Sequence, residues 1–126
     1  MVNRKSDEKN VVLRRALDFA VRIVKLHRYL NTNHKIFSLS DQILRAGTSI
    51  GANVVEAQDA QSDKDFVHKM SIALKEARET RYWIYLLTES EYLDKNAPRV
   101  VTLENDLDVL LRLLTSIVKT SRSKLQ

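Results

Sequence analysis

The chain has 126 residues, with 21 lysines and arginines against 16 aspartates and glutamates, and it contains no cysteine. This composition favours one globular domain and excludes disulfides, thiolate metal sites and a cysteine nucleophile. No apolar run approaches the roughly 20 residues that span a bilayer. The charged start of the chain is not followed by the apolar stretch of a secretory signal. We therefore expect a cytoplasmic protein that forms a single domain over residues 1–126 and does not enter a membrane.

Apolar residues recur at helical spacing in four blocks, and no block has the alternation of a strand. The predicted helices lie over about residues 10–30, 40–60, 62–88 and 98–119. Four amphipathic helices with short connections predict an all-α fold, an antiparallel up-down-up-down four-helix bundle.

The ends of three of these helices carry recognisable signals. We expect Ser40 or Ser38 to cap the second helix and Ser62 to cap the third. Pro98 is well placed in the first turn of the fourth helix. In the first helix, Leu13, Leu17 and Val24 are expected to widen the face that packs into the core.

Both glycines of the chain lie one turn apart inside the second predicted helix, at Gly47 and Gly51. Glycine costs a helix interior about 1 kcal/mol relative to alanine, so two of them require a reason. A small-xxx-small face lets a neighbouring helix approach closely, a geometry best known from membranes. Arg45, Asn53 and Glu56 on the same segment exclude a lipid setting, so we expect close packing in a water-soluble bundle.

The third predicted helix carries a second stripe that mixes apolar and charged residues. Its members are Lys69, Ile72, Glu76, Glu79, Trp83, Leu86 and Leu87. Such a mixture is typical of an oligomer interface, so we expect the protein to associate with itself through this stripe. The alternative is that Trp83 only covers the edge of its own bundle.

A polar stripe on the second predicted helix matches it. This stripe consists of Arg45, Ser49, Asn53 and Glu56. We expect Arg45 to pair with Glu76 or Glu79 and to set the register between helices, because an arginine–carboxylate pair demands a defined geometry. The alternative is a solvated polar face.

No catalytic constellation is visible in the sequence. Of the three histidines, His27 is expected to pack at the edge of the core and His34 to be solvated. Asp65 and His68 form one Asp-x-x-His pair, whereas di-metal bundles need two such pairs and two further carboxylates. Without a nucleophile or a phosphate-binding loop, we expect no enzymatic activity, no metal and no cofactor.

Basic residues concentrate on the first predicted helix and the loop after it. The candidates for phosphate contacts are Arg14, Arg15, Arg22, Lys25, Arg28 and Lys35. Asp18 lies four residues from both Arg14 and Arg22 and neutralises part of this charge. We expect binding to nucleic acid that is directed at the backbone and depends strongly on salt. The alternative is a protein-interaction scaffold whose charge serves only solubility.

The run from Gln42 to Leu87, QILRAGTSIGANVVEAQDAQSDKDFVHKMSIALKEARETRYWIYLL, resembles the bacterial four-helix bundle family of the 23S rRNA-intervening sequence protein. The likeness extends from about Phe19 to Leu125. It implies a ring-shaped homopentamer of antiparallel bundles, but no settled activity. The matching positions, interpreted as packing and interface residues, are Arg45, Gly47, Ser49, Gly51, Asn53, Glu56, Phe66, Glu76, Glu79, Tyr82 and Trp83.

A related branch, the accessory variability determinant of diversity-generating retroelements, resembles the same pentameric barrel. That branch works with a reverse transcriptase and binds nucleic acid through a basic surface. From the residues and the resemblance together, we expect a non-enzymatic homo-oligomer that binds structured RNA or DNA, as an accessory to RNA processing or reverse transcription. A protein partner such as a reverse transcriptase is part of the same expectation.

Overall fold

The computed structural model describes residues 4–126, with side chains from Val11 onward. This part of the chain contains four helices and no strand, which confirms the predicted all-α bundle. The helices are α1 (Arg4–Asn33), α2 (Phe37–Gln58), α3 (Asp63–Glu89) and α4 (Pro98–Ser123).

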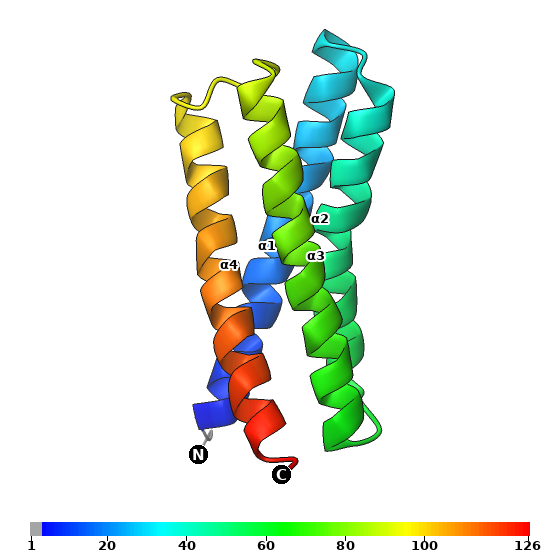
Figure 1. Ribbon diagram of the computed structural model, residues 1–126, viewed down its shortest axis with the longest axis vertical. Helices are drawn as coiled ribbons and strands as arrows, with labels where there is room; N and C mark the ends of the chain where they lie inside the picture. The colour runs from blue at the N-terminus through cyan, green and yellow to red at the C-terminus, as the bar shows by residue number, and fades with distance from the viewer. Residues whose placement is uncertain (1–3) are drawn as a thin grey trace.

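Consecutive helices run antiparallel, and the two ends of the chain lie at the same end of the bundle (Figure 1). α1 packs against α2 and α4, and α3 packs against the same two helices. The diagonal pairs do not come into close contact within the described residues, so the four helices form a square up-down-up-down arrangement. The outer surface of each adjacent pair is therefore a separate face of the molecule.

The core consists of one apolar line from each helix, as the helical period predicts. Phe19, Ile50, Met70 and Leu107 are among its fully buried side chains. Two expected contributors lie outside it: Leu17 is 44% exposed and Val24 is 43% exposed. The expectation that they widen the packed face of α1 is wrong, because the glycines of α2 meet Ala16, Ala20 and Ile23, and Leu17 and Val24 each lie about 100° further round the helix than Ala16 and Ile23.

Gly47 and Gly51 are buried where α2 crosses α1. A β-carbon at Gly47 would lie 2.7 Å from Cγ1 of Ile23, and one at Gly51 would lie 3.4 Å from the carbonyl oxygen of Ala16. The glycines thus permit a close approach between helices, as predicted, and the helix that approaches is α1 of the same chain.

The helix ends follow the sequence signals in two of three cases. The Ser62 hydroxyl accepts a hydrogen bond from the backbone N–H of Asp65 at 3.0 Å, and Pro98 occupies the first turn of α4. The predicted cap at Ser40 or Ser38 is wrong, because α2 already begins at Phe37 without a side-chain cap. The Ser40 hydroxyl is buried and instead donates to the side chain of Asn31 on α1. At its other end, α4 extends to Ser123 instead of ending near residue 119.

Candidate nucleic-acid interface

The outer surface of α1 is predicted to bind phosphates, because positive side chains outnumber carboxylates on this helix. From Val11 to Asn33, α1 contains five lysines and arginines but only one carboxylate, that of Asp18. Arg14 and Lys25 are both exposed and, at helical spacing, lie on one outward line with Asp18 between them. Arg28 is exposed one turn beyond Lys25. α1 therefore presents cations to solvent along most of its described length.

Arg22 differs from the other predicted phosphate ligands because α4 holds it. Its Nη1 donates to Asp106 at 2.7 Å, and its Nη2 donates to the carbonyl oxygen of Arg99 at 2.8 Å and to the Thr102 hydroxyl at 2.9 Å. These bonds compensate the charge of Arg22 and direct its guanidinium toward the α1–α4 contact. Arg22 thus joins two helices of one bundle. Binding a phosphate, as predicted, would require it to give up these hydrogen bonds.

The remaining predicted cations are free of such contacts. Arg15 lies seven residues before Arg22 and shares the flank of α1 that faces α4, but it is exposed. Lys35 lies in the turn between α1 and α2, in a left-handed backbone conformation with φ of 56°. Among the predicted phosphate ligands, those whose side chains make no ion pair with any other described residue are Arg14, Arg15, Lys25, Arg28 and Lys35.

Exposed apolar residues lie between and beside these charges on α1. Leu17, Val21 and Val24 follow one another at spacings of four and three, and Val21 is 55% exposed. Val55 of α2, 44% exposed, adds to the same face. Sequence reasoning missed this surface. The signal was present in the spacing, because Arg28 continues the line four residues after Val24 and cannot belong to a core face.

The predicted ion pair of Arg45 is present and joins α2 to α3. Its Nη1 lies 3.2 Å from Oε2 of Glu76, and its Nη2 binds Glu79. Oε2 of Glu79 also accepts from the indole N–H of Trp83 at 3.3 Å. The side chain of Glu76 is only 15% exposed, so the arginine compensates a carboxylate with little access to water. The network joins the two helices through the pairs that the sequence predicts, and its role in setting their register stays a prediction.

A second pair lies further along the same two helices. Lys69 Nζ is 2.9 Å from Oε2 of Glu56. The hydrogen bond and the attraction of this carboxylate raise the pKa of the Lys69 ammonium above its ordinary value. Asn53, between the two pairs, donates to the carbonyl oxygen of Ser49 in its own helix at 2.8 Å.

The stripe of α3 predicted as an oligomer interface has partners within its own bundle. Glu76 and Glu79 face α2, Leu87 is fully buried and Trp83 packs against the core. These contacts support the alternative, in which Trp83 covers the edge of its own bundle. An intermolecular role for the stripe stays a prediction.

The histidines are placed as follows. His27 Nε2 lies 2.9 Å from Oδ1 of Asp41, so it joins α1 to α2. His34 was expected to be solvated, but its ring packs edge-on against Tyr29 and Tyr92, with centroids 5.7 and 5.4 Å apart.

The other candidate metal ligands lie apart from these histidines. Asp65 accepts from the backbone N–H of Gln61 and takes part in the start of α3, while His68 is exposed. Among the described residues, no three histidine or acidic side chains come together as a metal site. Within the same range, no helix is both long and apolar enough to cross a membrane.

Comparison with known proteins decides the family. The family model of the 23S rRNA-intervening sequence protein matches residues 8–116. The chain belongs to this family. A similar solved structure is that of a protein of unknown function from the S23 ribosomal protein family of Bacteroides thetaiotaomicron, which is 49% identical, with a TM-score of 0.84. The match covers 89% of this chain and 98% of the other. No curated protein matches the chain.

The match over residues 8–116 includes all of α2 and α3 and most of α1 and α4. The basic surface of α1, the Gly47–Gly51 crossing and the Arg45 network therefore all lie within the residues that the family model matches.

Proposed function

We propose that this member of the 23S rRNA-intervening sequence protein family is a non-enzymatic homo-oligomer that binds structured RNA or DNA through α1, as an accessory to RNA processing or reverse transcription. The observation that carries the proposal is the set of exposed α1 cations without ion-pair partners among the described residues. Such side chains bind phosphates at little cost, because no existing pair has to be broken.

The spacing of these cations fits a nucleic-acid backbone better than a single phosphate. Arg14 and Lys25 share one line of α1 and are eleven residues apart, which corresponds to about 16 Å along the helix. Arg28 and Lys35 extend the series toward the α1–α2 turn. No aromatic recognition motif accompanies them on this line, so contacts are made to phosphates and sequence preference is weak.

A charge-reversal variant tests this surface. Arg14→Glu with Lys25→Glu changes two exposed, unpaired residues, so the bundle is expected to stay folded. Lys64→Glu with Lys95→Glu is the matched control, since both lysines are exposed, carry the same charge and lie off α1. We expect the α1 variant to lose at least tenfold in affinity for an RNA hairpin and for duplex DNA, and the control to lose less than threefold. Equal losses in the two variants would refute the α1 surface.

Self-association is the second part of the proposal, and a ring of five copies is what the family resemblance implies. Its support in the structure is the exposed apolar line of Leu17, Val21 and Val24, since monomeric proteins rarely leave such contiguous patches in water. An interface of two different faces generates a ring when its rotation closes. We assign this line to one of the two faces.

Val21→Gln with Val24→Gln tests the assembly without changing charge. The expected result is a shift in native mass toward the 14.6 kDa protomer with unchanged helicity. Val101→Gln on α4, at a residue that is 40% exposed, is the control and is expected to keep the wild-type mass. A wild type that is itself monomeric contradicts this part.

The same apolar line favours a second candidate function, a scaffold that binds a protein such as a reverse transcriptase and no nucleic acid. In that case the α1 cations serve solubility. Nucleic-acid binding by the wild type, lost in the Arg14→Glu and Lys25→Glu variant, separates the two functions.

A further inference from the structure

A groove of about 230 Å³ lies between α3 and α4, on a different face of the bundle from the α1 cations. Ile84 and Leu107, both nearly fully buried, contribute to its lining, and Tyr85, which is 58% exposed, stands beside them. Arg81 comes from α3 and Glu104 and Asp108 come from α4. The volume is below the roughly 300–1,000 Å³ of sites for drug-sized ligands, so the groove suits a fragment with one planar ring system.

The polar groups of the groove match the edge of a nucleobase. Glu104 and Asp108 lie one turn apart on α4 and make no hydrogen bond or ion pair with another described residue. Carboxylates accept from the exocyclic amino group of cytosine, and adenine has an equivalent donor. Tyr85 supplies an aromatic ring on which any base can stack.

A path of cations leads to this groove. Near the opposite end of the helix pair, Arg122 of α4 donates to the Ser71 hydroxyl of α3 at 3.2 Å. Lys119 and Lys75 lie within about one turn of this contact, three residues before Arg122 and four residues after Ser71. The exposed cations between the Arg122 contact and the groove are Lys75, Arg78, Arg112 and Lys119, and Arg81 is exposed at the groove itself.

The carboxylates of the same stretch of α3 do not cancel this charge. Glu76 and Glu79 face α2 and are paired with Arg45. Beyond the groove the sign of the charge reverses, since Glu89 is exposed in the last turn of α3. The α3–α4 face is therefore basic along most of its length. Its exposed carboxylates are those of Glu104 and Asp108 at the groove and Glu89 beyond the groove.

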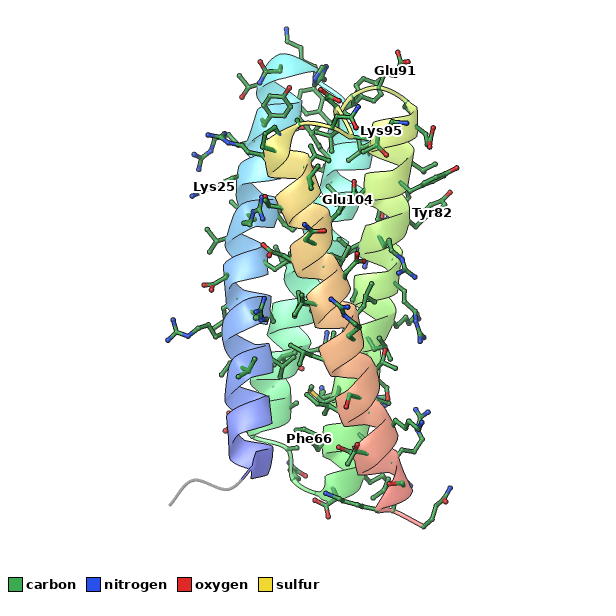
Figure 2. All side chains as sticks on the ribbon, turned by 90° about the vertical axis from the view of Figure 1, so that its left-hand side faces the viewer. Lys25, Phe66, Tyr82, Glu91, Lys95 and Glu104 are labelled. Atoms are coloured by element: carbon green, nitrogen blue, oxygen red, sulfur yellow. The ribbon has the colours of Figure 1, made fainter. Side chains whose placement is uncertain are left out.

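A second exposed aromatic ring stands next to the path. Tyr82 is 54% exposed, and its ring packs edge-on against Trp83 with centroids 5.1 Å apart. Figure 2 shows Tyr82 pointing away from α3 at a height similar to that of Glu104 on α4. Unpaired cations interspersed with exposed aromatic rings are the pattern that binds single-stranded nucleic acid, because bases have to be unpaired to stack on the rings.

We propose that the α3–α4 face binds single-stranded nucleic acid, with phosphates on the Lys75–Arg81 side and one amino-bearing base in the groove between Tyr85 and the Glu104 and Asp108 carboxylates. The inference rests on the proposed function in assigning nucleic acid to this protein, but it uses a different face and a different form of the ligand. Two carboxylates could also attract a basic peptide. The cationic residues along the path would repel such a peptide and therefore disfavour it.

Binding of fluorescently labelled (dC)10 and (dT)10 to the full chain tests the proposal. The wild type is expected to bind (dC)10 at least threefold more tightly than (dT)10, because thymine offers no amino group to the carboxylates. Tyr85→Ala is expected to lose about tenfold in affinity for (dC)10 through lost stacking. Phe37→Ala, at an aromatic residue that is 56% exposed at the start of α2, is the control and is expected to change little.

Removal of both carboxylates tests their contact with the base through the preference for (dC)10 over (dT)10. Loss of a purely structural contribution would weaken binding of both strands alike. Glu104→Ala with Asp108→Ala is expected to abolish the preference for (dC)10 while leaving (dT)10 affinity equal to the wild type or higher. Equal wild-type affinity for the two strands, or an unchanged affinity of the Tyr85→Ala variant for (dC)10, overturns the proposal that the groove binds a base. Binding of an arginine-rich peptide without binding of either strand overturns it in favour of a protein ligand.

The α1 variant keeps this inference separate from the proposed function. Arg14→Glu with Lys25→Glu is expected to lose hairpin binding and to keep its preference for (dC)10. If duplex binding depends on α1 and Tyr85→Ala has no effect, only the groove fails. If the wild type binds neither strand nor duplex, both proposals fail.

Discussion

The side chain of Ile23 fills the space above Gly47 in which any other residue would place its β-carbon. That atom would lie 2.7 Å from Cγ1 and 2.8 Å from Cγ2 of Ile23, both closer than van der Waals contact permits. Because Ile23 is fully buried, it cannot move aside into solvent. The distance between α1 and α2 is therefore set by the contact of a branched side chain with a bare backbone.

Gly47→Ala should destabilise the protein by about 1–3 kcal/mol, the usual range for overpacking, although alanine favours the helix. Gly51→Ala is the matched control, since its β-carbon would meet Ala16 only at 3.4 Å and beyond. The control should be neutral or more stable by up to about 1 kcal/mol. Urea denaturation of the two variants measures the difference, and equal effects would contradict the close contact at Ile23.

Arg22→Ala should lower the free energy of unfolding by about 1 kcal/mol, through loss of the bonds to Asp106, Thr102 and the Arg99 carbonyl. The figure is modest because the side chains of Arg22 and Asp106 are 31% and 44% exposed. Thermal denaturation beside Arg15→Ala, on the same flank but unpaired, provides the comparison. A loss no greater than that of Arg15→Ala would argue against the structural role.

Arg45→Met should cost about 1 kcal/mol, because it leaves Glu76 and Glu79 as neighbouring carboxylates without a cation. Glu76→Gln removes part of this repulsion. In a double-mutant cycle, the two changes together should therefore cost less than the sum of the single changes. Strict additivity would mean that the pair in the structure contributes nothing to stability.

The Lys69–Glu56 pair predicts a dependence of stability on alkaline pH. The folded state raises the pKa of Lys69, so the contribution of the pair is complete below the ordinary lysine pKa and is lost as pH rises through the raised value. The difference in urea midpoint between wild type and Lys69→Gln should be constant around neutral pH and shrink in strongly alkaline buffer. A difference that persists there would show that Lys69 acts through packing alone.

The helical period was enough to predict the four helices, because apolar spacing alone determines which side of each helix can be buried. The spacing on α2 and α3 also identified the partners of Arg45. The spacing could not identify Ile23 as the neighbour of Gly47. A face of small residues indicates that another helix approaches closely, but not which residue of that helix makes the contact.

Two features of the candidate interface depend on the assembled bundle. Arg22 and Asp106 are 84 residues apart, and their contact exists only because α4 lies beside α1. Leu17 and Val24 are exposed because the neighbouring helices bury only part of the apolar face of α1, and Arg28 on the same line is the one sequence signal of this limit. The α3–α4 groove combines side chains of two helices in the same way.

The most direct test of the α1 surface is the salt dependence of binding to a labelled RNA hairpin, measured for the wild type and for Arg14→Glu with Lys25→Glu, with the native mass checked in the same buffers. The wild-type affinity should fall steeply with salt, since phosphate contacts release counterions. The variant should bind more weakly, with a logarithmic slope flatter by about one to two. A variant of unchanged mass whose affinity and slope equal those of the wild type would contradict the account.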